Sequence, residues 1–553
     1  MRKSGVIGGL LLGAAAGAVQ ASDKPLYQPA PAWVTPAPAI DPTKLGEDAP
    51  LFLTLDQQDR LAEGTVWSYR DVATRMASPE VVQQAGTITI EWSPAKGDLL
   101  VHKVEILRGG QHIDALAGGR QFTVIRREQQ LERMAIDGQL TATLAVEGLQ
   151  VGDVLHTVVT VTRKEDALGG GVQDVLQAPA APARVGFART RLLWPAAAPI
   201  RWKVSAEGTA PQLTSVGGER ELVLTGVLPK PAELPADTPL RFRKLPIVEA
   251  ASFADWAAVS KVMAPYYAVD RAITPGGALA HEAAAIAAAQ SDPLKRADAA
   301  LELVQSKVRY LFNGLDKGNY VPQPAEQTWT LRYGDCKAKT VLLLALLHEL
   351  GVPAEAVLAS ADLGDAVPER LPSAAAFNHV LVHATITGKD YWLDDTGAGT
   401  RFPDIGDVPP LRWVLPLRAT GAELLRVPTQ PPARPQAEVA IDLDQRAGVL
   451  LPAVAHLKVT VRGAAAALLG MAKTQGSKDQ KDQAVQKMVS DIIGGDAVIT
   501  GYTLAYDPVE AVATVDATST VTTLWTRLDG RWRLPLDRTV GKLEFDPDRS
   551  RAA

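Results

Sequence analysis

The chain has one cysteine, Cys336, among its 553 residues. A single thiol excludes any disulfide within the chain, so a hydrophobic core has to hold the fold together. An unpaired cysteine is either a small buried side chain or a group retained for its reactivity. The residues around this cysteine are therefore the first place to look for chemistry.

The sequence also lacks long charge runs, and its net charge is only −5. Nucleic-acid binding needs a concentrated basic surface, so this composition argues against nucleic acid as a partner. Hydrophobic residues make up 46% of the chain and charged residues 22%, which is typical of a globular protein. A chain this long exceeds what one core usually supports and predicts about two to four domains.

No apolar run reaches the length of about 20 residues that a membrane-spanning helix needs. The N-terminus nevertheless has basic residues at 2–3, an apolar core at 6–19 and a small-residue pattern at 19–21. This order is typical of a signal peptide at residues 1–21, with an uncleaved anchor as the alternative. No cysteine follows the apolar core, so lipid attachment there is excluded. We expect an exported protein, in a bacterial periplasm, with no membrane span after cleavage.

The first half of the chain is expected to be rich in strands. Residues 22–50 are rich in Pro and Ala and predict an extended lead-in. From 51 to 245 the hydrophobic period is mostly two, as in "GTITIEW" and "DVLHTVVTVTR", with Gly109-Gly110 as a turn signal. We interpret residues 51–245 as an antiparallel β sandwich.

The second half of the chain is expected to contain both helices and strands. Residues 250–426 carry helical spacing, including one stretch over 293–312, and then strand-like runs. After a proline-rich linker, strands and a helix near 480–493 predict a further domain at 437–553. The expected fold class is therefore α+β and multidomain, with a central and a C-terminal α+β domain.

The stretch around the cysteine reads "RYGDCKAKTVLLLALLHELG" (332–351). Gly334 permits a tight turn, Asp335 is a good N-cap, and residues 337–350 favour a helix. Cys336 then falls in the first helical turn, where free N–H groups and the positive end of the helix dipole favour a thiolate. The same N–H groups could hold an oxyanion. This local pattern supports a packing role and a nucleophile equally.

A reactive thiol needs a base, usually a histidine that a third group orients. Four of the eight histidines belong to the flanking domains, and His281 lies on another helix. His348 lies on the cysteine's own helix, about 18 Å away at the helical rise, which is too far for a contact. Two candidates remain, His379 and His383.

These two histidines lie in "FNHVLVHATITGKDYWLDDT" (377–396), which predicts a β hairpin. Alternation places both on one face. If the turn is centred on Thr387-Gly388, Asp394 shares that face and lies diagonal to His379. If the turn is centred one residue later, Asp394 faces His383 instead. The pattern alone leaves the register open.

A cysteine that starts a helix, a histidine that opens a strand and an aspartate that ends the next strand resemble the transglutaminase-like superfamily, a papain-like group. The resemblance covers roughly residues 285–405. It implies Cys336 as nucleophile, His379 as general base and Asp394 as the orienting acid. It favours His379 over His383 because the family's histidine follows a short polar residue at the start of the strand.

A second, weaker resemblance covers the preceding β region, and two positions near the proposed site differ from the family's usual residues. The preceding β region resembles a bacterial domain of unknown function that commonly precedes transglutaminase-like domains in exported proteins. Many relatives have aspartate where Ala338 stands and proline where Asp395 stands, but neither is a triad position. The family's side-chain oxyanion donor lies upstream of the cysteine, where Gln327 and Trp329 are available without an assigned role.

The chemistry implied is acyl transfer through a thioester on Cys336. Water is the abundant acceptor in a periplasm, so we expect hydrolysis rather than cross-linking, on a protein, a peptide or a cell-wall stem peptide. His348-Glu349 lacks a second histidine at helical spacing, and the glycine pairs are turn signals, so no metal and no cofactor are expected. The alternative is a non-catalytic binding or scaffolding protein that uses the same fold. The flanking domains could in turn bind carbohydrate or peptidoglycan.

Overall fold

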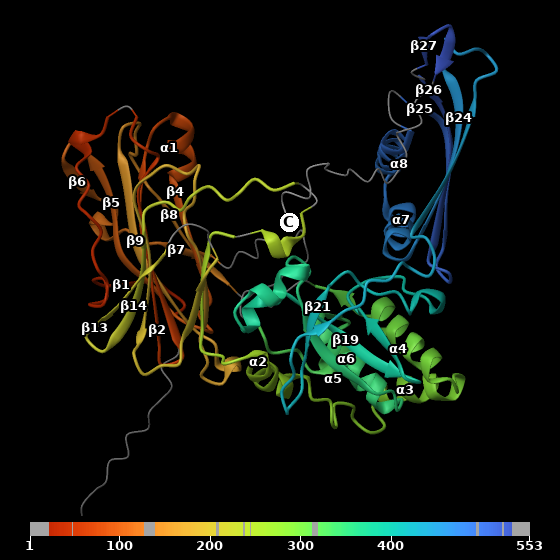
Figure 1. Ribbon diagram of the computed structural model, residues 1–553, viewed down its shortest axis with the longest axis horizontal. Coiled ribbons are helices and arrows are strands. Elements are labelled where there is room, and N and C mark those ends of the chain that lie inside the picture. Colours follow the sequence, from red (N-terminus) through yellow and green to blue (C-terminus); the bar gives the residue numbers. More distant parts are fainter. Residues whose placement is uncertain are drawn as a thin grey trace, which may run out of the picture.

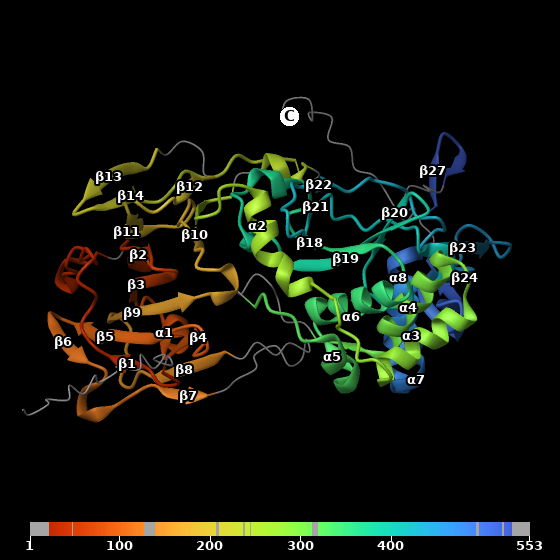
Figure 2. The same cartoon turned by 90° about the horizontal axis from the view of Figure 1, so that it is seen from below.

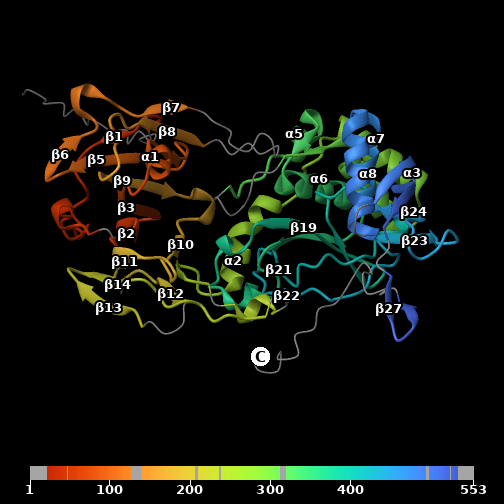
Figure 3. The ribbon, with the colours of Figure 1, turned by 90° about the horizontal axis from the view of Figure 1, so that it is seen from above.

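The structure, a computed structural model, describes residues 22–46, 48–125, 139–205, 210–235, 238–243, 245–311, 319–493, 497–522 and 525–533. The signal peptide expected at 1–21 lies outside these residues. Three parts follow one another, and we call them the N-terminal part (22–251), the middle part (252–436) and the C-terminal part (437–533). In all three views the N-terminal part lies to the left and the C-terminal part to the right, beside the middle part (Figures 1, 2 and 3).

A large sheet forms the centre of the N-terminal part. Among the described residues it has nine strands, which run in the order β1 (Leu26–Tyr27), β5 (Leu99–Arg108), β9 (Val154–Lys164), β3 (Thr65–Arg75), β2 (Phe52–Ala62), β11 (Val185–Pro195), β14 (Glu219–Thr225) and β13 (Gln212–Val216), with β6 (Gln111–Asp114) beside β5. Most neighbours are antiparallel, as expected. The pairs β1–β5 and β2–β11 are parallel, however, so the purely antiparallel expectation is corrected there. Alternation along a strand sets its buried face but not the direction of its partner.

Two small sheets pack on one face of the large sheet. Their strands are β4 (Thr87–Trp92), β8 (Leu140–Ala145) and β7 (Thr123–Ile125) in one sheet, and β10 (Gln173–Gln177), β15 (Ile247–Ala251) and β12 (Arg201–Val204) in the other. Each encloses its own core, and helix α1 (Pro79–Ala85) closes the first of them. This layered packing is the sandwich expected from the period of two.

The lead-in crosses the opposite face of the large sheet, which is polar. Gln58 accepts a hydrogen bond from Thr35 N at 3.1 Å and donates one to Thr35 O at 2.7 Å. Arg191 donates to Trp33 O at 2.8 Å and to the Gln58 side chain at 2.8 Å. The extended lead-in therefore satisfies buried polar groups of the sheet.

In the middle part, helices pack on a five-stranded antiparallel sheet. The helices are α2 (Trp256–Met263), α3 (Ala278–Ala289), α4 (Pro293–Lys307), α5 (Ala325–Leu331) and α6 (Cys336–Glu349). Within the described residues the sheet order is β20 (Lys389–Leu393), β19 (His379–Ile386), β18 (Ala354–Ala359), β21 (Trp413–Pro416) and β22 (Leu425–Arg426). Helix α6 is apolar on nearly every side because other helices and the sheet surround it.

The stretch 293–312 is shorter as a helix than its spacing predicts. The Asp292 carboxylate caps α4 by accepting from Leu294 N at 2.8 Å and Lys295 N at 3.0 Å. The helix ends at Lys307, and β16 (Arg309–Tyr310) then pairs in parallel with β17 (Tyr333–Gly334). The chain leaves the helix because this short strand joins the segment before α6.

The C-terminal part is a four-stranded antiparallel sheet with two helices on one face. Among the residues described there, the sheet order is β23 (Ala437–Asp444), β24 (Ala453–Arg462), β26 (Val512–Val521) and β25 (Val498–Asp507), and the helices are α7 (Gly463–Gln475) and α8 (Lys478–Ile493). A hairpin of β27 (Thr526–Leu528) and β28 (Arg531–Arg533) follows. Helix α8 agrees with the helix expected near 480–493. Helix α7 was missed, since it is rich in Ala and Gly and has no side-chain cap.

None of the helices in the described part of the chain is long and apolar enough to cross a membrane.

Candidate active site

Helix α6 begins at Cys336, as the sequence predicts. The Asp335 side chain caps it by accepting a hydrogen bond from Ala338 N at 3.0 Å. Gly334 allows the close approach, since a Cβ there would lie 2.7 Å from the Ala338 Cβ. The thiol thus lies at the positive end of the helix dipole, where an anion is favoured. Cys336 is only 1% exposed.

Two lysines of this helix, Lys337 and Lys339, are buried beside the cysteine. Lys337 pairs with the Asp335 carboxylate. Lys339 Nζ donates to Val308 O at 2.7 Å and to Val304 O at 3.3 Å, so it binds carbonyls at the end of α4. Burial lowers the pKa of Lys339. These contacts fix the start of α6 against α4.

The hairpin of β19 and β20 has the register in which the turn is centred on Thr387-Gly388. Its turn is Thr387-Gly388, both with positive φ, and Val382 lies opposite Leu393. This register places Asp394 diagonal to His379, as the alternation requires. His379 Nε2 lies 3.0 Å from Asp394 Oδ2.

The second oxygen of Asp394 is held separately. Asp394 Oδ1 accepts hydrogen bonds from Thr396 N at 3.0 Å and Thr396 Oγ1 at 2.6 Å. With both oxygens engaged, the carboxylate is fixed in the orientation that meets His379.

His379 and Asp394 each stabilise the charged form of the other. Burial of His379 lowers its pKa, but the hydrogen bonds to Asp394 and to Cys336 outweigh burial and raise the pKa to about 10. For Asp394, burial raises the pKa, but the contact with His379 and the bonds from Thr396 lower it to about 2. The imidazole therefore interacts with the carboxylate on one side and the thiol on the other.

His383, the other candidate base, has different partners. Its ring stacks on Trp392 with centroids 4.5 Å apart. Its Nδ1 lies 3.2 Å from Glu355 Oε1 and its Nε2 lies 3.1 Å from Asp390 Oδ1. Both ring nitrogens thus face carboxylates, and of the two only Nδ1 is hydrogen-bonded.

The geometry suits proton transfer from a thiol. Because Nε2 of His379 faces a carboxylate, its N–H points there and leaves Nδ1 for proton exchange with the thiol. A thiol that shares a hydrogen bond with this imidazole can pass its proton to Nδ1. Within the described ranges no three His, Cys, Asp or Glu side chains gather as metal ligands.

Asp395 is a neighbour that the motif analysis noted only as a departure. It is fully buried, and its Oδ2 accepts a hydrogen bond from Thr340 Oγ1 at 3.1 Å. Burial, followed by repulsion from Asp394, raises the pKa of Asp395 well above its usual value. The sequence signal was the pair Asp394-Asp395, which places two carboxyl groups on opposite faces of one strand end.

Two tyrosines near the thiol were missed altogether. The strand pair β16–β17 places Tyr310 opposite Gly334, two residues before the cysteine. The Tyr267 hydroxyl is buried and has no hydrogen-bond partner. Burial raises the pKa of both tyrosines, and the charge on Cys336 is the next largest cause. No local motif could have indicated them, because tertiary packing brings them to the thiol.

The two residues considered as oxyanion donors lie on α5. Gln327 is exposed, and Trp329 is buried with the Arg332 guanidinium 3.5 Å from its ring centroid. The structure assigns the oxyanion role to neither.

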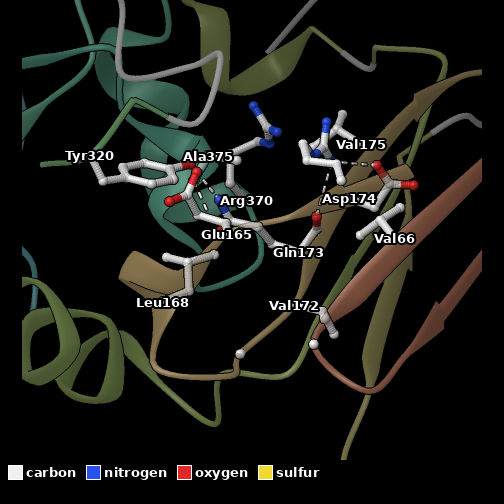
Figure 4. A pocket seen from close by; sticks show the side chains of 13 residues that line it. Val66, Glu165, Leu168, Val172, Gln173, Asp174, Val175, Tyr320, Arg370 and Ala375 are labelled. Carbon is white, nitrogen blue, oxygen red and sulfur yellow. Dashed lines mark hydrogen bonds and ion pairs between the residues drawn. The ribbon is translucent and has the colours of Figure 1, made fainter. Parts of the chain in front are cut away.

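The N-terminal part contacts the segment that leads to His379. Gln173 on β10 accepts hydrogen bonds from Ala374 N at 2.9 Å and Ala375 N at 3.3 Å, and it donates to the Tyr320 hydroxyl at 2.5 Å. These groups line a cavity of about 220 Å³ between the two parts, in which the Gln173 side chain lies close to Tyr320 and Ala375 (Figure 4). A second cavity, of about 480 Å³, lies beside Asp394 and is bounded by both the middle and the C-terminal parts.

Comparisons with known proteins agree with this arrangement. Residues 280–395 match the model of the transglutaminase-like superfamily, and residues 62–233 match a domain of unknown function, DUF3857. None of the curated proteins matches the chain.

Solved structures give a broader likeness. A crystal structure of a candidate protease from Parabacteroides distasonis ATCC 8503 aligns over 85% of this chain and 93% of its own, with a TM-score of 0.56 and 12% identity. A candidate cysteine protease from Cytophaga hutchinsonii aligns over 41% of this chain and 75% of its own, with a TM-score of 0.20 and 14% identity. The first likeness extends to the overall fold, and the second is too low to carry an argument.

Proposed function

We propose that this chain, in which a DUF3857 domain precedes a transglutaminase-like domain, is an exported cysteine enzyme that acts on amide bonds through a thioester. The observation that carries the proposal is the contact of 3.0 Å between His379 and Asp394, with Cys336 as a further cause of the raised pKa of the same imidazole. These residues supply the three groups that acyl transfer requires, a nucleophile, a base and an orienting acid.

The first half of the reaction forms the thioester. With its pKa raised to about 10, His379 already holds the thiol proton on Nδ1 near neutral pH, and the thiolate sulfur of this ion pair attacks the carbonyl carbon of the substrate amide. The negative charge that develops on the carbonyl oxygen is stabilised by the Cys336 backbone N–H at the start of α6. The C–N bond then breaks, His379 returns its proton to the leaving amine, and the acyl group remains on sulfur.

The second half transfers the acyl group to an acceptor. With water, His379 takes one proton while the water oxygen bonds to the thioester carbon. The C–S bond then breaks, the sulfur regains the proton from His379, and the products are a carboxylic acid and the free thiol. With a primary amine the product is a new amide. We favour water, since it is the abundant acceptor in the proposed periplasmic location. The substrate class is a protein, a peptide or a cell-wall stem peptide.

Burial of Cys336 favours a second candidate function. A thiol that is 1% exposed has no open approach for a substrate in this conformation. A non-catalytic binding or scaffolding protein could keep the transglutaminase fold with such a buried cysteine. The two functions differ in one measurable property, the reactivity of the thiol.

The experiment is alkylation of the full chain with an iodoacetamide probe, which can label only Cys336 because it is the one cysteine. We expect labelling near neutral pH to be faster than for a model thiol, and to be about tenfold slower in His379→Ala. His383→Ala is the matched control, since its ring contacts Trp392, Glu355 and Asp390 instead. Equal, slow labelling in wild type and both variants would favour the scaffold.

A further inference from the structure

The loop that begins at the acid, residues 394–401, is held from behind by helix α4. Gln305 Nε2 donates to Asp394 O at 2.8 Å and to Thr400 Oγ1 at 3.0 Å. The same side chain accepts a hydrogen bond from Thr400 N at 3.1 Å through its Oε1. One glutamine therefore ties the start of this loop to its end.

The C-terminal part holds the far end of the same loop. Arg401 Nε donates to Val509 O at 2.7 Å, and its Nη2 donates to Pro508 O at 2.7 Å. Gly399 packs so closely on this part that a Cβ would lie 2.9 Å from Gly463 O and 3.1 Å from the Ala511 Cβ. On the C-terminal side the contact is thus made by the turn between β25 and β26 and by Gly463, the first residue of α7.

These contacts matter because the acid works only in one orientation. Displacement of a catalytic group by about 1 Å can cost 10²-fold in rate. The cavity of about 480 Å³ beside Asp394 leaves the carboxylate partly exposed on that side, so packing does not hold it there. Thr396, which holds Asp394 Oδ1, lies in this loop, so the position of that restraint depends on how the loop is anchored at both ends.

We propose that the C-terminal part is a positioning element of the active site, which acts through Arg401 and the loop 394–401 to hold Asp394 against His379. Gln305 completes the anchorage from α4. The inference rests on the proposed function for its catalytic meaning, but the structural coupling can be measured without a substrate.

The direction in which the His379 pKa changes distinguishes movement of Asp394 from the simple loss of the Arg401 charge. Asp394 raises the pKa of His379, so displacement of the carboxylate lowers that pKa. Removal of the Arg401 cation alone has the opposite effect, because loss of a nearby positive charge raises the pKa of a histidine. A lower His379 pKa in Arg401→Ala therefore reports movement of the acid.

The test is NMR titration of His379 in the full chain, with its signal assigned from His379→Ala. We expect Arg401→Ala to lower the pKa of His379 by about one pH unit or more and to slow alkylation of Cys336 about tenfold. Arg446→Ala is the matched control, since Arg446 pairs with Asp444 in the same C-terminal part and is exposed. Gln305→Met, which is neutral and similar in volume but loses both donors, replaces Arg401→Ala if that variant does not fold.

An unchanged or raised His379 pKa in the folded Arg401 or Gln305 variant would overturn the positioning proposal. The result is independent of turnover. If the chain proves to be a scaffold, the His379 pKa still falls when the loop is released, so failure of the proposed function and failure of this proposal are distinguishable.

Discussion

His379 Nε2 and Asp394 Oδ2 lie 3.0 Å apart, although the two residues are not directly opposite each other in the hairpin. The two-residue turn at Thr387-Gly388 makes them diagonal neighbours on one face. A slip of one residue would have turned Asp394 to another partner. The contact is therefore a direct consequence of the register of β19 and β20.

Loss of the charge on Asp394 should disable the pair without a change in volume. In Asp394→Asn we expect the pKa of His379 to fall and alkylation of Cys336 near neutral pH to slow at least about tenfold, since an amide can stabilise the wrong tautomer of the ring. Asp390→Asn, next to His383, is the control and should leave the rate unchanged. Equal rates in Asp394→Asn and wild type would show that the acid does not support the base.

The pH dependence of stability should reveal the raised pKa of His379. Its folded-state pKa of about 10 exceeds the ordinary value of about 6.5, so the folded protein binds this proton more tightly than the unfolded chain. The stabilisation is complete below about pH 6.5 and is lost as the pH rises through about 10.

The measurement is thermal unfolding of wild type and His379→Ala as a function of pH. We expect the difference in Tm to shrink between about pH 7 and about pH 10.5. Asp394 has the opposite sign, because its pKa of about 2 is depressed and its stabilisation is lost as the pH falls towards that value. A constant Tm difference across the alkaline range would contradict the raised pKa of His379.

Asp395 should respond to pH in the reverse direction from Asp394. Burial raises its folded-state pKa, so its contribution to stability is greatest below about pH 4 and declines as the pH rises. We expect Asp395→Asn to gain in free energy of unfolding relative to wild type between about pH 4 and about pH 8. Chemical denaturation at several pH values measures this trend, and a flat difference would argue that Asp395 ionises normally.

Gln173 should contribute to the junction between the N-terminal and middle parts. Gln173→Ala leaves two backbone N–H groups, of Ala374 and Ala375, without their acceptor. Loss of a buried hydrogen-bond partner costs about 1–3 kcal/mol, so we expect unfolding by urea at a lower concentration. Gln177→Ala on the same strand is exposed and serves as the control. Identical midpoints for the two variants would count against this role for Gln173.

Local signals predicted much of the architecture. The change from a period of two to helical spacing separated the strand-rich N-terminal part from the middle part, and the cap at Asp335 gave the start of α6 correctly. Helix α7 escaped because its start has no side-chain cap and its residues are small. The end of α4 at Lys307 was not predicted, because β16 pairs with a strand more than twenty residues later. Strand pairing between segments that are distant in sequence does not change the local hydrophobic periodicity, so that periodicity cannot predict it.

The sequence by itself determined that Cys336 starts a helix, since a turn, a cap and a helical run lie within a few residues of one another. It also restricted the candidate base to His379 or His383, because the other histidines lie in the flanking domains, on another helix or too far along α6. Only the tertiary structure set the turn register, which places Asp394 diagonal to His379, and only packing brought Tyr267 and Tyr310 near the thiol. The same holds for the contact between Arg401 and the carbonyls of residues 508 and 509, since it joins residues that are more than one hundred positions apart.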